Sequence, residues 1–229
     1  MIFPSFQYYK APSLNEALNY ISKLKNGFVF MSGGTDLVPQ IKQETVCPKY
    51  VISLYGIPEL SQIENQDFIS IGSQVTLSDL ASNPIISKHL PWLSEIISNI
   101  ATPQIRNRAT VGGNLLANNR CIYYNQSLLI RSAHSLCFKA GGEVCHLIPN
   151  VKHSDTPLCQ ARFISDLAAV FLLLDSYVVL KSKDIERKVK LREFYLPDGI
   201  NRNILKSGEI LTHIEITLPQ KAKIYYEKL

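Results

Sequence analysis

The sequence predicts a fold that mixes α-helices and β-strands. A helical spacing of apolar residues in SLNEALNYISKLKNG, short apolar runs such as FVFM and VISL, and a series of strand-like segments after residue 175 support this prediction. The chain has 229 residues, of which 46% are hydrophobic and 19% charged. Such a chain can bury a core as one large domain or two small ones.

The first helix is expected within residues 13–27. Its apolar residues recur at the spacing of one helix face, at Leu14, Ala17, Leu18, Ile21 and Leu24. Ser13 and Glu16 form a capping box at its start, and Gly27 suits its end.

FVFM predicts a buried strand that leads into SGGTDLVPQIKQ. There Gly33 and Gly34 permit a tight turn, and Thr35 is expected to cap a short helix that tolerates Pro39 in its first turn. VISL predicts a strand, FISIGSQVTLSDL a strand followed by a turn and a helix start, and PWLSEIISNI a helix. We place a domain boundary in YGIP, between residues 56 and 57.

In the second half of the chain, SDLAAVFLLLD predicts a helix capped by Ser165. SYVVLKS, KVKLREF and ILTHIEITL predict strands. The longest apolar run, LAAVFLLL, is far shorter than the roughly 20 residues of a membrane helix, so we expect no membrane span. The amino terminus, MIFPSFQYYK, lacks the pattern of a secretory signal, and we expect a cytoplasmic protein.

The net charge of +5 comes from scattered basic residues. In IERKVKLR the charges alternate with Val189 and Leu191, as on a solvated strand face. We therefore expect no nucleic-acid binding.

Two glycine-pair loops, MSGGTDL and ATVGGNL, carry the main chemical signal. Glycine permits positive φ and a close approach of the backbone to a ligand, and successive N–H groups then bind anions. A helix that starts after such a loop adds a partial positive charge. Two facing loops would hold a pyrophosphate from both sides, although each pair is also compatible with a plain turn. Neither loop is a Rossmann or Walker motif.

FVFMSGGTDLVPQIKQ, ISIGSQVTLSDL, ATPQIRNRATVGGNLLA, ISDLAAVFLLLDSYVVL and GEILTHIEI resemble, in order and spacing, the FAD-binding subunit of the molybdenum hydroxylase (xanthine oxidase) family. The resemblance covers nearly the whole chain. It implies an α+β FAD-binding domain of the vanillyl-alcohol oxidase type, with subdomains over residues 1–56 and 57–229. An insertion at residues 119–160 most resembles the 4-hydroxybenzoyl-CoA reductase β subunit.

The resemblance implies which residues hold FAD. They are Met31, Ser32, Gly33, Gly34, Thr35, Asp36, Leu37, Ala101, Thr110, Gly113, Asn114, Asp166, Leu211 and Lys228. By itself, Asp166 would be interpreted as a second cap beside Ser165, and Lys228 as a frayed tail residue.

Within the insertion, the resemblance implies four ligands of a [4Fe-4S] cluster, namely Cys121, Cys137, Cys145 and Cys159. Four thiolates suit such a cluster, because its iron atoms bind soft anionic ligands. The cysteines lack a C-x-x-C spacing, so the residues alone leave open four separate thiols, or zinc bound by cysteine with His134, His146 or His153. Cys47 lies outside the set and is interpreted as a lone thiol.

The implied function is electron transfer in anaerobic aromatic degradation. Reduced ferredoxin would supply the [4Fe-4S] cluster and FAD, and a [2Fe-2S] small subunit would carry electrons to a molybdopterin-binding large subunit that reduces a 4-hydroxybenzoyl-CoA-like substrate. No residue of this chain would then be catalytic toward the substrate.

Two other functions stay open. The FAD subunit of an ordinary molybdenum hydroxylase, of the xanthine or CO dehydrogenase type, would not need the four cysteines. A zinc-stapled binding module would not need both glycine loops. The family's C-terminal domain is not present before the chain ends at Leu229, so we expect either a separate chain that supplies it or a fragment.

Overall fold

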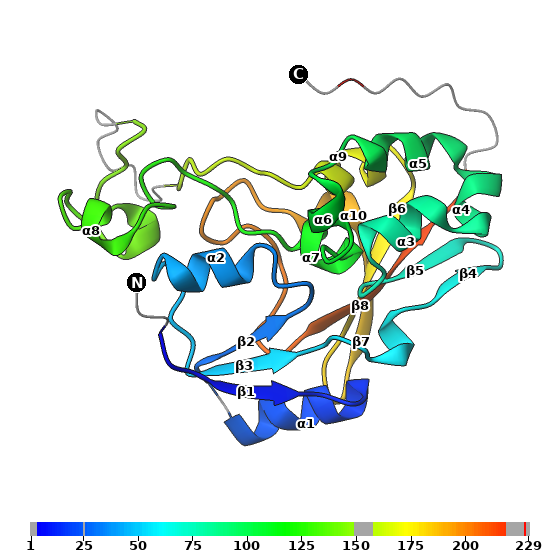
Figure 1. Ribbon diagram of the computed structural model, residues 1–229, viewed down its shortest axis with the longest axis horizontal. Coiled ribbons are helices and arrows are strands. Elements are labelled where there is room, and N and C mark those ends of the chain that lie inside the picture. The colour runs from blue at the N-terminus through cyan, green and yellow to red at the C-terminus, as the bar shows by residue number, and fades with distance from the viewer. Residues whose placement is uncertain (1–3, 25, 149–157, 219–226, 228–229) are drawn as a thin grey trace.

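A computed structural model describes residues 4–24, 26–148, 158–218 and 227. Within these ranges the strands form two sheets that occupy different parts of the molecule, with helices packed around them (Figure 1). The predicted mixture of helices and strands is confirmed.

The first sheet is parallel, and its three strands all lie in the first quarter of the chain. They are β1 (Gln7–Lys10), β2 (Phe28–Met31) and β3 (Tyr50–Ser53), with β3 in the centre. Helices α1 (Leu14–Leu24) and α2 (Leu37–Lys42) lie on opposite sides of this sheet (Figure 1). β1 carries no alternating pattern and was not predicted.

Helix α1 begins and ends as predicted. The Glu16 N–H donates to Ser13 Oγ at 3.2 Å, which satisfies one of the free donors of the first turn. Beyond the helix, Gly27 has a φ of +73° and turns the chain into β2. The apolar face of α1 buries Ala17 and Leu18 in a core shared with the first sheet.

The second sheet is antiparallel, with the strand order β4-β5-β8-β6-β7. The strands are β4 (Ile63–Asn65), β5 (Ile69–Gly72), β6 (Ser176–Lys181), β7 (Glu186–Lys190) and β8 (Ile210–Ile216). The prediction that KVKLREF continues as a strand was wrong in part, because helix α10 (Leu191–Phe194) follows β7 directly. Leu191 and Phe194 are buried there against the main core.

Short helices pack on the second sheet and enclose the larger core. They are α3 (Leu77–Ser82), α4 (Pro84–His89), α5 (Pro91–Ser98), α6 (Pro103–Arg106), α7 (Val111–Leu115) and α9 (Asp166–Phe171), whereas η1 (Pro58–Leu60) contributes Leu60 to the core of the first sheet. Side-chain caps begin several of them, since the N-terminal turn leaves N–H groups without partners. The predicted cap of α9 is confirmed, because Ser165 Oγ accepts from the Ala168 N–H at 3.1 Å.

The insertion is a long loop closed at its base by an antiparallel backbone bridge. Arg120 and Arg162 exchange two backbone hydrogen bonds of 2.9 and 2.7 Å. Helix α8 (Leu128–Arg131) and the turn η2 (Phe138–Ala140) are formed inside it. The loop is attached to the carboxyl end of α2, since the Tyr124 hydroxyl donates to Thr45 O at 2.9 Å. The insertion and α2 therefore lie together at one end of the molecule (Figure 1).

Two predictions concern the chain as a whole. Among the described residues, no helix is long and apolar enough to cross a membrane. The two sheets use residues on either side of position 56, but Ile210 of β8 packs into the core of the first sheet. The boundary between residues 56 and 57 therefore stays a prediction.

Candidate functional site: two neighbouring cavities

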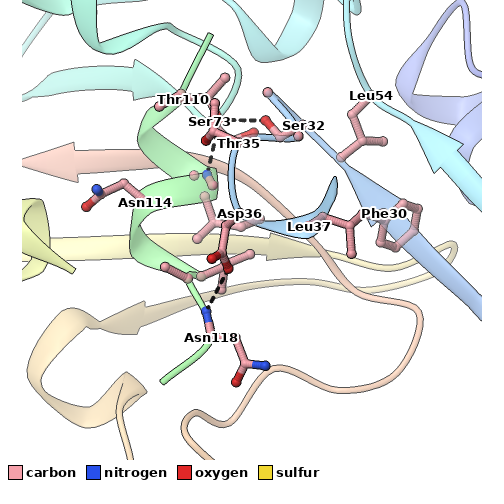
Figure 2. A pocket seen from close by; sticks show the side chains of 18 of the residues that line it. Phe30, Ser32, Thr35, Asp36, Leu37, Leu54, Ser73, Thr110, Asn114 and Asn118 are labelled. Atoms are coloured by element: carbon pink, nitrogen blue, oxygen red, sulfur yellow. Dashed lines mark hydrogen bonds between the residues drawn. The ribbon is translucent and has the colours of Figure 1, made fainter. Parts of the chain in front are cut away.

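A cavity of about 650 Å³ lies where the loop after β2 faces α7 (Figure 2). Twelve of the fourteen predicted FAD contacts line it, namely Ser32, Gly33, Gly34, Thr35, Asp36, Leu37, Ala101, Thr110, Gly113, Asn114, Asp166 and Leu211. Met31 is not among the described lining residues, and Lys228 lies outside the described part of the chain. The fold therefore gathers residues that are distant in sequence around one space.

The first glycine loop, residues 32–36, presents its backbone to this cavity. Gly33 packs against the backbone of the opposite loop, where a Cβ atom would lie 1.8 Å from the Arg108 carbonyl oxygen. Gly34 has a φ of +75°. In the described structure the N–H groups of residues 33–36 donate no hydrogen bond. This loop thus offers a row of backbone donors, as an anion site requires.

Thr35 does not cap α2, which corrects the prediction from sequence. The N-cap position is Asp36, and its side chain makes no capping bond. Its carboxylate instead accepts from Gln40 Nε2 at 2.6 Å and from Arg120 Nη2 at 2.6 Å. Figure 2 shows Asp36 directed toward Asn118, whose N–H donates to it at 3.4 Å. The carboxylate therefore joins α2 to the base of the insertion.

The second glycine loop differs from the prediction. Its glycines lie within the first turn of α7, neither has a positive φ, and Thr110 is the N-cap. Its N–H groups are occupied, because that of Gly112 donates to Ser73 O at 2.8 Å and that of Gly113 to Thr110 Oγ1 at 3.1 Å. A Cβ atom on Gly112 would lie 2.6 Å from that of Ser73. This loop is thus a closely packed wall, and the free backbone donors belong to the first loop.

Hydroxyl groups connect the two loops. Ser32 Oγ and Thr110 Oγ1 are hydrogen-bonded at 2.5 Å, and Ser32 Oγ also donates to Gln74 Oε1 at 3.0 Å. Figure 2 shows the bond between Ser32 and Thr110 across the gap between the loops. These bonds fix the distance between the two walls of the cavity.

Asn114 and Asp166 lie at the junction of α7 and α9. Asn114 Oδ1 accepts from Ser165 Oγ at 2.9 Å and from the Leu167 N–H at 3.1 Å. Ser165 is the cap, while Asp166 is the first residue of α9 and lines the cavity. On the sheet side, Leu211 of β8 is buried and contributes an apolar contact surface.

Arg202 is a cation of the cavity wall that the sequence did not indicate. Its Nη2 donates to Leu116 O at 3.1 Å, whereas its Nε is buried and has no partner in the described structure. Burial lowers the pKa of this guanidinium, and Asp36 opposes the shift. Its neighbours in the sequence carry no motif, so only the tertiary structure reveals it. Its positive charge at the cavity wall favours an anionic ligand.

The second cavity lies inside the insertion and is lined by all four predicted thiols. Cys121, Cys137, Cys145 and Cys159 surround a space of about 20 Å³, together with His146 and Lys139. The cysteines are free and partly buried, and Cys47 is exposed and does not line this cavity. His134 lies beside His146, with ring centroids 5.6 Å apart, and His153 lies outside the described residues.

The described residues contain no group of three or more cysteine, histidine or acidic side chains that could hold a metal ion. The second cavity is also no larger than the space of about one water molecule.

Cys159 is positioned by a turn that the sequence analysis did not identify. Asp198 Oδ1 accepts from the Cys159 N–H at 2.9 Å, and a Cβ atom on Gly199 would lie 2.8 Å from Cys159 Sγ. Burial opposes ionisation of Asp198, but three backbone donors hold its pKa below the usual value. Burial raises the pKa of the Cys159 thiol. The Asp-Gly pair was the available signal of this turn.

Comparison with known proteins identifies the fold. The family model described as "FAD binding domain in molybdopterin dehydrogenase" matches residues 4–220. The FAD-binding subunit of aldehyde oxidoreductase from Escherichia coli (strain K12) is 32% identical over 213 residues, which are 89% of this chain and 65% of that protein. The carbon monoxide dehydrogenase medium chain of Hydrogenophaga pseudoflava is 37% identical over 116 residues, which are 50% of this chain and 40% of that protein.

Solved structures share the architecture. Quinoline 2-oxidoreductase from Pseudomonas putida 86 matches with a TM-score of 0.71 at 22% identity, covering 96% of this chain and 61% of that one. Carbon monoxide dehydrogenase from Hydrogenophaga pseudoflava matches with a TM-score of 0.68 at 25% identity, covering 95% and 61%. The chain thus spans less than two thirds of these relatives, and it belongs to the family of FAD-binding domains of molybdopterin dehydrogenases, which confirms the predicted fold class.

Proposed function

We propose that this chain binds FAD in the 650 Å³ cavity and is the flavin component of a molybdenum hydroxylase-type oxidoreductase. The observation that carries this proposal is the first glycine loop: residues 33–36 line the cavity, and their N–H groups donate no hydrogen bond in the described structure. The oxidoreductase complexes named among the relatives support the same class of activity.

The residues present fit the cofactor. FAD carries a pyrophosphate, which would supply acceptors for the free N–H groups of the first loop, and Arg202 would add positive charge to the cavity wall. Asp36 would repel a phosphate, but the Arg120 guanidinium already compensates its charge and Gln40 donates a hydrogen bond to it, so its oxygens suit a sugar hydroxyl better. Leu211 and Leu37 offer apolar surface to a ring system.

Bound FAD supplies both one- and two-electron chemistry. The contribution of this chain is to bind and orient the cofactor and to exclude water from it. The proposed partners are a molybdopterin-binding large subunit, where the organic substrate would react, and a [2Fe-2S] small subunit. No described side chain is therefore assigned as a catalytic acid, base or nucleophile.

Substitution of Gly113 tests the FAD site. A Cβ atom there would lie 3.0 Å from Thr110 Oγ1 and 3.7 Å from Ser32 Cβ, so the larger side chain of Gly113→Val would force the two walls apart. We expect FAD affinity to fall by about 10- to 100-fold, the loss expected for one or two contacts to a charged group. Flavin fluorescence quenching measures it.

Ala169→Val is the matched control, because it places the same side chain at an exposed position of α9 that does not line the cavity. Unchanged affinity in Gly113→Val, with FAD bound elsewhere, would refute the assigned site. Failure of the unmodified chain to bind FAD would refute the proposed function.

A second candidate concerns the insertion. We propose that Cys121, Cys137, Cys145 and Cys159 bind a [4Fe-4S] cluster, as in the 4-hydroxybenzoyl-CoA reductase type, with a ferredoxin as the electron donor. The four thiols around one cavity favour it, whereas the named relatives favour the ordinary hydroxylase flavin subunit. A [4Fe-4S] core needs more room than the cavity of about 20 Å³, so the loops must move apart on loading.

Reconstitution with iron and sulfide separates these candidates. We expect the broad absorbance of an iron–sulfur cluster, and its loss in Cys137→Ser, since one thiolate ligand is removed. Cys47→Ser is the control, because Cys47 is exposed and does not line the cavity. Zinc uptake without iron, retained by Cys137→Ser and lost on substitution of His146, would contradict the cluster.

A further inference from the structure

Ala101 has a strained backbone at the wall of the large cavity. Its φ is +52°, in the left-handed region that residues other than glycine seldom adopt, because the Cβ atom then crowds the backbone. Ala101 is exposed and lines the cavity, and its N–H donates no hydrogen bond in the described structure. Strained residues persist where surrounding contacts hold them, and they cluster at ligand-binding sites. Some contact of the fold must therefore compensate for the strain at Ala101.

The side chain of Arg106 makes that contact. Arg106 Nη1 donates to Ile100 O at 3.0 Å and to Ala101 O at 2.8 Å. The first carbonyl belongs to the peptide group before the Ala101 Cα atom, and the second to the peptide group after it. Because each peptide group is planar, holding both of them fixes the backbone dihedral angles of Ala101. Both bonds come from a charged donor, which makes them stronger than bonds between neutral groups.

The local sequence places Arg106 where it can reach back to Ala101. Thr102 is extended because it precedes Pro103, and a residue before proline is kept out of the helical region. Helix α6 therefore begins at Pro103, with Thr102 Oγ1 accepting from the Ile105 N–H at 3.4 Å. Arg106 is the last residue of α6, and it is half-buried and is not among the described residues that line the large cavity. Its structural link to the cavity is the backbone that it holds.

The same arrangement occurs at a second place in the molecule. Glu44 is the other described non-glycine residue with a positive φ, at +55°. Arg131 Nη2 donates to Gln43 O at 3.1 Å and to Glu44 O at 2.9 Å, again to the carbonyl groups on both sides of the left-handed residue. Glu44 is not among the described residues that line the large cavity. Two segments distant in sequence thus pair a left-handed residue with an arginine, which indicates that the arginine supports this conformation.

We propose that Arg106 is a positioning residue that holds Ala101 in its left-handed conformation, and that FAD binding requires this conformation of the cavity wall. The inference rests on the proposed function, because its effect is exerted on the bound cofactor. Without Arg106, the backbone of Ala101 relaxes to a negative φ, and FAD binding must restore the strained conformation at a cost in affinity. Glycine adopts a positive φ without strain, so Ala101→Gly removes the need for the arginine.

The test compares the dissociation constant of FAD, measured by flavin fluorescence quenching, in the full chain with and without Ala101→Gly. Alone, Arg106→Met should weaken FAD binding by about 5- to 30-fold, the factor that corresponds to the strain of one left-handed residue. Most of this loss should disappear when Ala101→Gly is also present. Arg131→Met is the matched control, because it removes the same charge and the same kind of contact from Glu44, and it should leave FAD affinity unchanged.

Arg106→Lys supplies a further readout and should retain most of the FAD affinity, because an ammonium group can also donate to both carbonyl oxygens. Unchanged affinity in Arg106→Met, an equal loss with and without Ala101→Gly, or a similar loss in Arg131→Met overturns the positioning role and leaves the proposed function intact. If Arg106→Met does not fold, the double variant decides, and weak FAD binding or loss of folding there overturns the proposal. An unmodified chain that binds no FAD overturns both.

Discussion

The two cavities are built in different ways. The large one lies between the ends of regular elements, and its walls meet through backbone contacts such as Gly33 against Arg108 and Gly112 against Ser73. The cysteine cavity is lined by loop segments with one short helix and one turn inside the described part of the loop, and the bridge between Arg120 and Arg162 closes the base of that loop. The large cavity is therefore part of the regular fold, whereas the cysteine cavity lies within a loop segment.

Because the two cavities are built differently, we expect them to respond differently when no ligand is bound. The large cavity is held by the two sheets and by the Ser32–Thr110 bond, so it should persist without FAD. The insertion has little core of its own, because Ile122, Leu129 and Leu136 are exposed. A metal centre would supply much of its local stability, as in other small metal-organised segments.

The largest effect on stability and FAD binding is expected from Gly33→Ala, which places a methyl group between the two loops that form the walls of the large cavity. A Cβ atom 1.8 Å from the Arg108 carbonyl oxygen cannot be accommodated unless the loops separate. We expect a loss of about 3 kcal/mol of unfolding free energy, as for severe overpacking, together with loss of FAD binding. Denaturant unfolding and flavin titration measure both.

Gly56→Ala is the control for that variant. Gly56 also requires a special backbone, with a φ of +84°, but no atom lies within 4 Å of the Cβ position. It should cost about 1 kcal/mol from backbone strain and leave FAD binding unchanged. Normal FAD affinity in Gly33→Ala would contradict the described contact between the loops.

Metal loading should protect the insertion selectively. At a free metal concentration one hundred times the dissociation constant, its local stability rises by about 2.7 kcal/mol, and limited proteolysis within it slows by roughly 100-fold. The first sheet serves as the internal reference and should show no change. Equal protection of both regions, or of neither, would show that the second cavity is not organised by a metal.

The ion pair of Arg187 and Glu209 supports the large cavity from the side of β7. The guanidinium donates to both carboxylate oxygens at 2.7 Å, and Glu209 lines the cavity. We expect Glu209→Gln to cost about 2 kcal/mol at pH 7, since it removes charged hydrogen bonds to a partly buried group. Glu186→Gln, in an exposed pair with Lys181 on the same hairpin, should cost below about 1 kcal/mol.

The same pair predicts a dependence on pH. The bond to Arg187 holds the pKa of Glu209 below its ordinary value of 4.5. Because the pKa of Glu209 is lowered in the folded state, the contribution of its ionised carboxylate to the free energy of unfolding is fully present above pH 4.5. This contribution is lost as the pH falls through the folded-state pKa. The stability difference between the unmodified chain and Glu209→Gln should therefore shrink in acid. A constant difference would exclude this ionisation as its cause.

The smallest effect is expected from the cap of α7. Thr110→Ala removes the oxygen that accepts from Gly113 N and bonds Ser32, and should cost about 1 kcal/mol. Thr110→Ser keeps both bonds and should retain nearly full stability and FAD affinity. Thermal unfolding with and without FAD compares them. Equal losses in the two variants would show that the hydroxyl contributes nothing.

Local signals in the sequence predicted the parts of the fold that depend on local physics. The cap at Ser13, the strand at FVFM and the Ser165-capped helix follow from spacing and residue type, but the prediction that FVFM is buried was wrong, because it is a half-buried edge strand. The role of Thr35 was wrong because Asp36 occupies the N-cap position and is bonded to Arg120, 84 residues away. The sequence also could not show that the second glycine loop has no free backbone donors. The Gly112 N–H donates to Ser73 O, which lies on a segment distant in sequence.

The site was partly predictable for the same reason. The glycine pairs and the four cysteines identified which segments would line the cavities. Arg202, Lys139 and Asp198 were missed, because their importance comes from contacts with residues distant in sequence and not from any motif.

The most direct test of this account is to purify the chain without oxygen and to quantify FAD, iron, acid-labile sulfide and zinc, with spectra before and after dithionite. We predict FAD together with about four irons and four sulfides per chain, with both chromophores bleached by the reductant. FAD without iron would contradict the role assigned to the cysteine cavity. Zinc without FAD would contradict the account as a whole.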